Sequence, residues 1–170
     1  REAGLEPLAW ILYSQKEENI NKCAQRFLNK NMSTSQLALD GAKDIIAEWI
    51  NEDQNVRSAL RRSYSRNGLL TSKVIKQKAA LAESQKYKQY FEWEEPLHKV
   101  PSHRFLAMYR AEKEGVLKLK AEIEKENALR LIDRQIIVPG RNNCKKYLEQ
   151  AVEDAFTRLL KPSFQTEVLN

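Results

Sequence analysis

The chain has 170 residues and a net charge of +6, from 29 basic and 23 acidic side chains. Charged residues make up 31% of it, whereas Gly and Pro each occur only five times. This composition is typical of a helical protein and excludes β-sandwich, collagen-like and low-complexity classes, which need many more turn or repeat residues.

The two cysteines, Cys23 and Cys144, are far apart and form no CxxC pair. With only two histidines besides, the chain cannot supply the ligand spacing of a zinc finger, so we expect no metal and no cofactor. No apolar run approaches the roughly 20 residues of a membrane span, and we expect no membrane partner. The chain starts without Met. We therefore interpret it as a fragment of a longer, cytoplasmic protein.

The first third of the chain predicts helices over residues 7–13, 17–29 and 33–51. The second has apolar residues at helical spacing, and Cys23 lies on that apolar stripe, as expected of a small core residue. The third begins at a Ser-Thr-Ser-Gln capping box. Gly41 lies inside this helix, and because a glycine there usually permits close approach of another element, we interpret it as a packing contact.

The next helix is predicted from an Asp53 N-cap to a Gly68 terminator. Four arginines fall on its two flanks in pairs spaced i, i+4, and like charges at this spacing repel. Residues 51–90 contain nine basic and three acidic side chains, a net of +6 that equals the whole excess of the chain. Such a stripe is typical of a polyanion binder, although a solvated helix face is the commoner explanation. The candidate phosphate-binding residues are Arg57, Arg61, Arg62, Arg66, Lys73, Lys76 and Lys78.

The basic run continues over residues 69–82, where Val74, Ile75 and Leu81 are apolar side chains that can pack it against a core. The aromatic cluster that follows, Tyr87, Tyr90, Phe91 and Trp93, has helical spacing. We therefore favour a core stripe over base stacking for it.

In the second half, Ser102 and Gly115 bound a predicted helix over about 103–114. Residues 116–124 alternate between apolar and charged side chains, which predicts a strand whose partner is either 136–138 or outside this chain. Helices are predicted over 125–135 and from Asn142 or Asn143 to Pro162.

We therefore expect an all-α fold, mainly helical with helix-turn-helix-like elements, about seven helices and at most one small β element. Two sub-lobes, 1–92 and 93–170, are one way to divide it. The sequence contains no phosphate-binding glycine loop, HExxH, GxSxG or paired carboxylates. Catalysis by this segment is therefore not expected.

Three stretches together resemble a known family. They are Gly-Ala-Lys-Asp-Ile-Ile-Ala-Glu at 41–48, Val-Pro-Ser-His-Arg-Phe-Leu-Ala with Arg-Ala-Glu-Lys-Glu-Gly within 100–115, and Asp-Ala-Phe-Thr-Arg-Leu-Leu-Lys-Pro-Ser at 154–163. Their order and content resemble the N-terminal helical region of the bacterial Tex transcription accessory proteins. The family pattern usually has Gly, Lys and Glu where this chain has Ala111, Thr157 and Gln165.

The resemblance implies a larger protein that continues into a ribonuclease-H-like domain, helix-hairpin-helix units and an OB-fold RNA-binding domain, none of them in this chain. It implies a role in transcription and in the binding of nucleic acid, either RNA or DNA, by the full-length protein. We expect a monomeric helical scaffold whose basic face makes phosphate contacts independent of sequence. The alternative is an architectural module that docks an acidic surface of RNA polymerase, the ribosome or its own missing domains.

Overall fold

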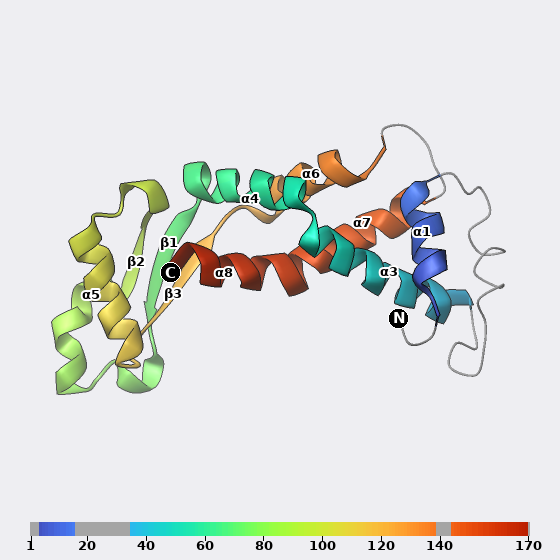
Figure 1. Cartoon of the computed structure of the whole chain (residues 1–170). Coiled ribbons are helices and arrows are strands. Elements are labelled where there is room, and N and C mark those ends of the chain that lie inside the picture. Colours follow the sequence, from blue (N-terminus) through green and yellow to red (C-terminus); the bar gives the residue numbers. More distant parts are fainter. Residues whose placement is uncertain (1–3, 16–34, 139–143, 170) are drawn as a thin grey trace. The chain divides into compact units, whose positions relative to one another are not determined.

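The computed structural model describes residues 4–15, 35–138 and 144–169, and these are mainly helical (Figure 1). The chain divides into two compact units, and each is discontinuous in sequence. Unit 1 comprises residues 1–60 and 126–162, and unit 2 comprises 61–125 and 163–170. The sequence analysis considered a continuous division at residue 92 instead.

Unit 1 is built of helices, in which α3 packs against α1 and α7. Buried leucine, isoleucine and alanine side chains of these helices form its core, including Leu8, Leu12, Ile46 and Leu148. The helices that contribute to unit 1 are α1 (Glu6–Ser14), α3 (Ser35–Glu52), the first half of α4 (Gln54–Asn67), α6 (Lys125–Ile136) and α7 (Lys145–Asp154).

The predicted helix boundaries are largely confirmed in this unit. Pro7 lies in the first turn of α1, and the Asp53 carboxylate caps α4 by accepting a hydrogen bond from the Val56 amide at 2.9 Å. The predicted helix over 17–29 lies outside the described residues. A Cβ at Gly41 would clash with Leu5 Cδ1. The predicted packing contact at Gly41 is therefore confirmed, and its close neighbour is a side chain.

The sequence predicted that the last helix ends at Pro162, and this was wrong, because the helical run continues to Leu169. A π-helical stretch, Ala155–Leu160, follows α7 and leads directly into α8 (Lys161–Leu169). Pro162 has no backbone N–H to donate. It follows directly after a π-helical stretch, in which the backbone hydrogen bonds already differ from the i→i−4 bonds of an α-helix. Phe156, Leu160 and Phe164 are buried along this continuous run.

Unit 2 contains, within the described residues, an antiparallel sheet of order β2-β1-β3 (Figure 1). Its strands are β1 (Leu69–Val74), β2 (Glu92–Pro96) and β3 (Leu117–Glu122). The strand predicted over 116–124 is confirmed. The strand β1 was not predicted, since residues 69–82 were interpreted only as a continuation of the basic run, and the limit of one small β element was wrong. The partner of β3 is β1 and not 136–138, since Ile136 ends α6.

One face of the sheet is covered by α5 (Ser102–Lys113) and by the 3-10 helix Ala82–Tyr90. Side chains alternate along a strand, so every second residue of β1 and β3 points to this covered face. The buried cluster there contains Leu70, Leu117, Leu119, Met108, Tyr87 and Tyr90. The predicted core role of the aromatic cluster is therefore confirmed for both tyrosines.

The outer edge of β3 is closed by side chains. The Leu119 amide donates to Glu112 Oε2 and the Ala121 amide donates to Gln165 Oε1, each at 2.8 Å. The Gln165 side-chain amide also donates to the Ala121 carbonyl. Because a carboxamide both donates and accepts, Gln165 satisfies two backbone groups at once, as a neighbouring strand would.

We predict that Gln165→Glu destabilises the chain by about 1–3 kcal/mol at pH 7, because a carboxylate cannot donate to the Ala121 carbonyl. The carbonyl would raise the pKa of the new carboxyl above the ordinary value of about 4.3. The loss should therefore be full at neutral pH and should shrink as the pH falls through that raised pKa. Urea unfolding at pH 7 and pH 4.5 measures it.

Gln89→Glu is the matched control, because Gln89 is exposed and, among the described residues, its side chain has no hydrogen-bond partner. Equal stability changes in the two variants would contradict the role given to Gln165.

Candidate nucleic-acid interface

The positive charge of the chain belongs to one unit. The residues of unit 2 include fifteen basic and nine acidic side chains, a net of +6, whereas those of unit 1 include fourteen of each. The whole excess over neutrality thus falls within unit 2. A polyanion would therefore be attracted more strongly to unit 2 than to unit 1.

Two of the predicted phosphate-binding arginines are engaged within the protein. In unit 1, Arg57 Nη1 donates to the carbonyl of Asn51 at 2.9 Å and to its Oδ1 at 3.2 Å. In unit 2, Arg61 Nη2 lies 2.8 Å from Glu167 Oε1, and its guanidinium lies 5.9 Å from the centroid of the Phe164 ring. Both arginines therefore have competing partners.

The other five predicted residues belong to unit 2 and, within the part of the chain that the structure describes, their side chains form no ion pair. These five residues are distributed over three different secondary-structure elements. Arg62 and Arg66 are exposed on α4, Lys73 is exposed on β1, and two lysines belong to the 3-10 helix that follows β1. That short helix is Lys76–Lys78.

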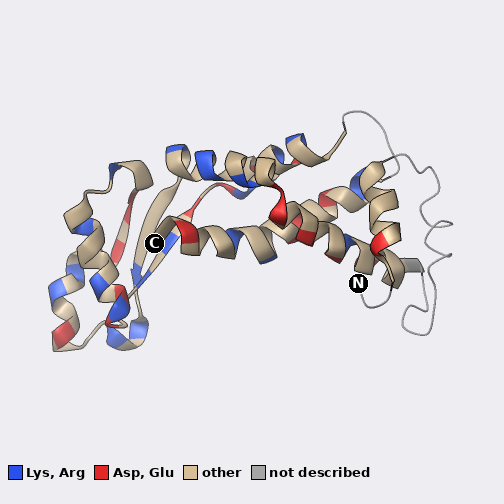
Figure 2. Ribbon diagram, in the orientation of Figure 1, with Lys and Arg blue, Asp and Glu red and all other residues tan. Residues whose placement is uncertain are grey.

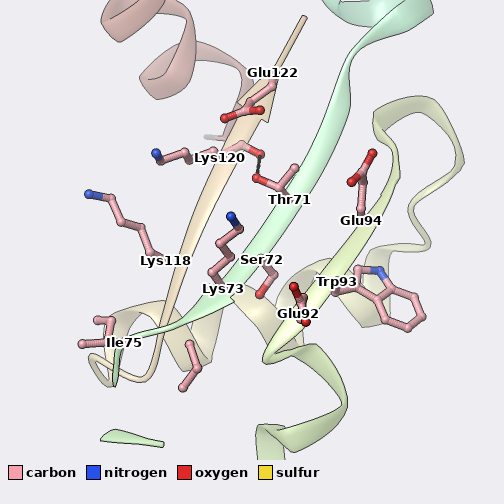
Figure 3. A pocket seen from close by; sticks show the side chains of 11 residues that line it. Thr71, Ser72, Lys73, Ile75, Glu92, Trp93, Glu94, Lys118, Lys120 and Glu122 are labelled. Carbon is pink, nitrogen blue, oxygen red and sulfur yellow. Dashed lines mark hydrogen bonds between the residues drawn. The ribbon is translucent and has the colours of Figure 1, made fainter. Parts of the chain in front are cut away.

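The open face of the sheet places Lys73 with two lysines that are not among the candidate phosphate-binding residues, Lys118 and Lys120. Lys73 of β1 stands opposite Lys118 of β3, and Thr71 stands opposite Lys120. The three lysines line one hollow of about 520 Å³ (Figure 3). The Thr71 hydroxyl donates to the Lys120 carbonyl at 3.5 Å, which ties the two strands at this point.

Carboxylates lie along the β2 edge of the same open face. Glu92 and Glu94 of β2 stand opposite Lys73 and Thr71, so acidic residues lie on β2 and basic residues on β1 and β3 (Figure 2). The indole of Trp93 points away from the lysines (Figure 3). The polar surface of this face therefore consists of charged groups and one hydroxyl, with Glu122 at the end of β3.

Directly opposed like charges destabilise an antiparallel pair by a fraction of a kcal/mol, and Lys73 and Lys118 are such a pair. Among the described residues, no carboxylate forms an ion pair with any of the three lysines that line the hollow. A bound anion would relieve this repulsion.

The sequence did contain a signal for Lys118 and Lys120. Their alternation with apolar residues predicts that both lie on the solvent face of a strand. Lys73 was not placed beside them, because residues 69–82 were interpreted only as a continuation of the basic run and no strand was predicted there.

Tyr64 of α4 is a buried aromatic residue of unit 2. Its ring stacks on Phe164 with centroids 5.2 Å apart, and its hydroxyl is buried without a hydrogen-bond partner among the described residues. Burial, with a smaller contribution from the Glu122 carboxylate, raises the pKa of Tyr64 to about 12. The residue is therefore a neutral element of packing at physiological pH.

In the described parts of the chain, no group of three or more His, Cys, Asp or Glu side chains is arranged to hold a metal ion. No helix there is both long and apolar enough to cross a bilayer.

Comparison with known proteins identifies the family. The family described as Tex central region-like matches residues 15–170. The chain belongs to the Tex family. It is thus a Tex-like domain of a transcription accessory protein family, as the resemblance of the three sequence stretches indicated.

Individual relatives agree. The chain is 34% identical over 168 residues to the uncharacterized protein YdcI of Bacillus subtilis, which covers 97% of the chain and 23% of that protein. It is 40% identical over 120 residues to protein YhgF of Escherichia coli, covering 69% of the chain and 15% of that protein. It is 33% identical over 126 residues to the transcriptional accessory protein Tex of Neisseria gonorrhoeae, covering 74% of the chain and 16% of that protein. The chain therefore spans less than a quarter of the length of these Tex relatives.

We predict that Tyr64→Phe leaves stability at pH 8 nearly unchanged, because it removes a hydroxyl without a described partner. Since the folded pKa of about 12 exceeds the unfolded value of 10.0, the wild-type chain loses stability as the pH rises between them. At pH 11 the variant should therefore gain about 1 kcal/mol relative to wild type. Urea midpoints at pH 8 and pH 11 measure this.

Tyr109→Phe is the control for the general effect of alkali. The assignment fails if Tyr64→Phe and Tyr109→Phe follow the same pH dependence.

Proposed function

We propose that this chain of the Tex family binds nucleic acid through the phosphates of the nucleic acid, using the open face of the sheet in unit 2. The observation that carries the proposal is the convergence of Lys73, Lys118 and Lys120 on one hollow, without an ion pair among the described residues. Arg62, Arg66, Lys76 and Lys78 add charge within the same unit. The printed name of the Neisseria gonorrhoeae relative, transcriptional accessory protein, supports a role in transcription.

The chemistry of the face favours contacts that ignore sequence. Base readout needs hydrogen-bonding or stacking groups aimed at the bases, whereas ammonium groups act on phosphates as point charges. The lining of the hollow offers lysines, carboxylates and Thr71, and the Trp93 indole is turned away from it. Arg57 and Arg61 contribute less in this proposal than the sequence suggested, because Asn51 and Glu167 engage them.

A salt titration of the whole chain tests the proposal, with labelled duplex and single-stranded 20-mers of DNA and RNA as probes. If about five phosphates are neutralised on duplex DNA, the logarithm of the affinity falls with the logarithm of salt at a slope of about −4.5. We predict that Lys73→Gln/Lys118→Gln/Lys120→Gln makes this slope shallower by about 2.7 and weakens binding at low salt.

The matched control is Lys145→Gln/Lys146→Gln/Lys161→Gln, which removes the same charge from exposed lysines of unit 1. Equal losses in the two triple variants would show that net charge alone matters and would overturn the assignment of the face. If the wild-type chain fails to bind any probe at low salt, nucleic-acid binding is rejected and docking to an acidic protein surface becomes the explanation of the lysines.

We also propose that this segment binds and positions its partner and is not itself an enzyme. This rests on the sequence, which offers no nucleophile beside an evident base and no phosphate-binding glycine loop. Incubation of the chain with labelled RNA and DNA should leave the strands intact. Cleavage that is abolished by one point substitution would reject this part of the proposal.

A further inference from the structure

Three aromatic side chains of unit 1 form a cluster at the surface, between α1 and α3. The centroids of Trp10 and Trp49 lie 4.6 Å apart with the rings tilted by 41°. Tyr13 meets both rings edge to face, 5.8 Å from Trp49 and 6.2 Å from Trp10. Trp10 is nevertheless 59% exposed. A large indole that is held in place by two other rings and still faces solvent is the usual anchor of a binding site.

Two glutamates lie within one helical turn of the tryptophans of this cluster. Glu6 lies one helical turn before Trp10 on α1, and Glu52 lies three residues after Trp49 on α3, so both border the rings. Both carboxylates are exposed, and among the described residues neither forms an ion pair. Asp53 is near enough to Tyr13 to contribute, after burial, to raising the pKa of that phenol. The cluster is therefore aromatic at its centre and acidic at its rim.

The cluster holds no cation of its own within the described residues, although five other aromatic rings of the chain do have a Lys or Arg over them. Aromatic faces attract cations, and Trp does so most strongly, because the ring quadrupole is negative above and below the plane. Carboxylates beside the ring add a Coulomb attraction of the same sign. This combination of rings and carboxylates is complementary to a positively charged, flat group.

We propose that Trp10, Tyr13 and Trp49, with Glu6 and Glu52, form a docking site for an arginine side chain presented by a basic segment of a protein partner. Arginine suits the site because its planar guanidinium can stack on the exposed indole while its N–H groups donate to the neighbouring carboxylates. The same carboxylates repel phosphate, so this site is separate from the lysine-lined hollow of unit 2 and does not depend on the proposed nucleic-acid binding.

The test is a titration of the whole chain with an Ac-Arg-Gly-Arg-Gly-Arg-NH2 peptide, followed by the three indole N–H signals in NMR spectra. The chain has three tryptophans, and only Trp10 and Trp49 belong to the cluster, so Trp93 serves as an internal reference. We expect the signals of Trp10 and Trp49 to shift and that of Trp93 to stay. Trp10→Ala should weaken binding by fivefold or more.

A peptide with citrulline in place of arginine separates charge from shape, because it keeps the planar group without the positive charge. Glu6→Gln/Glu52→Gln leaves every ring in place and should weaken arginine-peptide binding severalfold, whereas Glu126→Gln/Glu149→Gln, elsewhere in unit 1, should not. The proposal is overturned if the citrulline peptide binds equally well, or if both double variants lose the same affinity. Absence of any shift at millimolar arginine peptide would also overturn it.

Discussion

The antiparallel pairing of β1 with β3 is the constraint on which unit 2 depends. Side chains alternate along a strand, so burying Leu117 and Leu119 against Met108 forces Lys118 and Lys120 to the opposite face. The same register places Lys73 beside Lys118. The grouping of lysines is therefore a consequence of how the apolar residues pack. A shift of the register by one residue would bury the charges and expose the core.

Local signals predicted the helices of unit 1 well, because caps and helical periodicity act within a few residues. The Asp53 cap and the course of α3 are of this kind. The strand β3 was visible too, since alternation is also a local pattern. The strand β1 was not, because its six residues, which include Lys73, carry little periodicity. Their strand conformation depends on partners that lie 19 to 53 residues away in the chain. Missing β1 also concealed which lysines share a face.

The arginines of α4 show the same difference between local patterns, which the sequence reveals, and contacts between distant residues, which it does not. The repulsive i, i+4 spacing on α4 led the sequence analysis to assign these arginines to phosphate contacts. The partner of Arg61 is Glu167, which is 106 residues away and so could not be recognised from the sequence. The salt bridge is solvent-exposed on both sides, and such pairs contribute little to stability. Its main effect is to hold one guanidinium on Phe164, so that the cationic surface of unit 2 is weighted toward the strands.

The capped edge of β3 has a further consequence. Exposed strand edges invite pairing with other chains, which leads to aggregation or domain swapping. At one edge of this sheet, Glu112 and Gln165 occupy the amides of Leu119 and Ala121 that an incoming strand would use. At the other, β2 is short, carries glutamates and ends at Pro96. The sheet is thereby protected against growth in either direction, and its lysine face can stay open to solvent without making the protein prone to form fibrils.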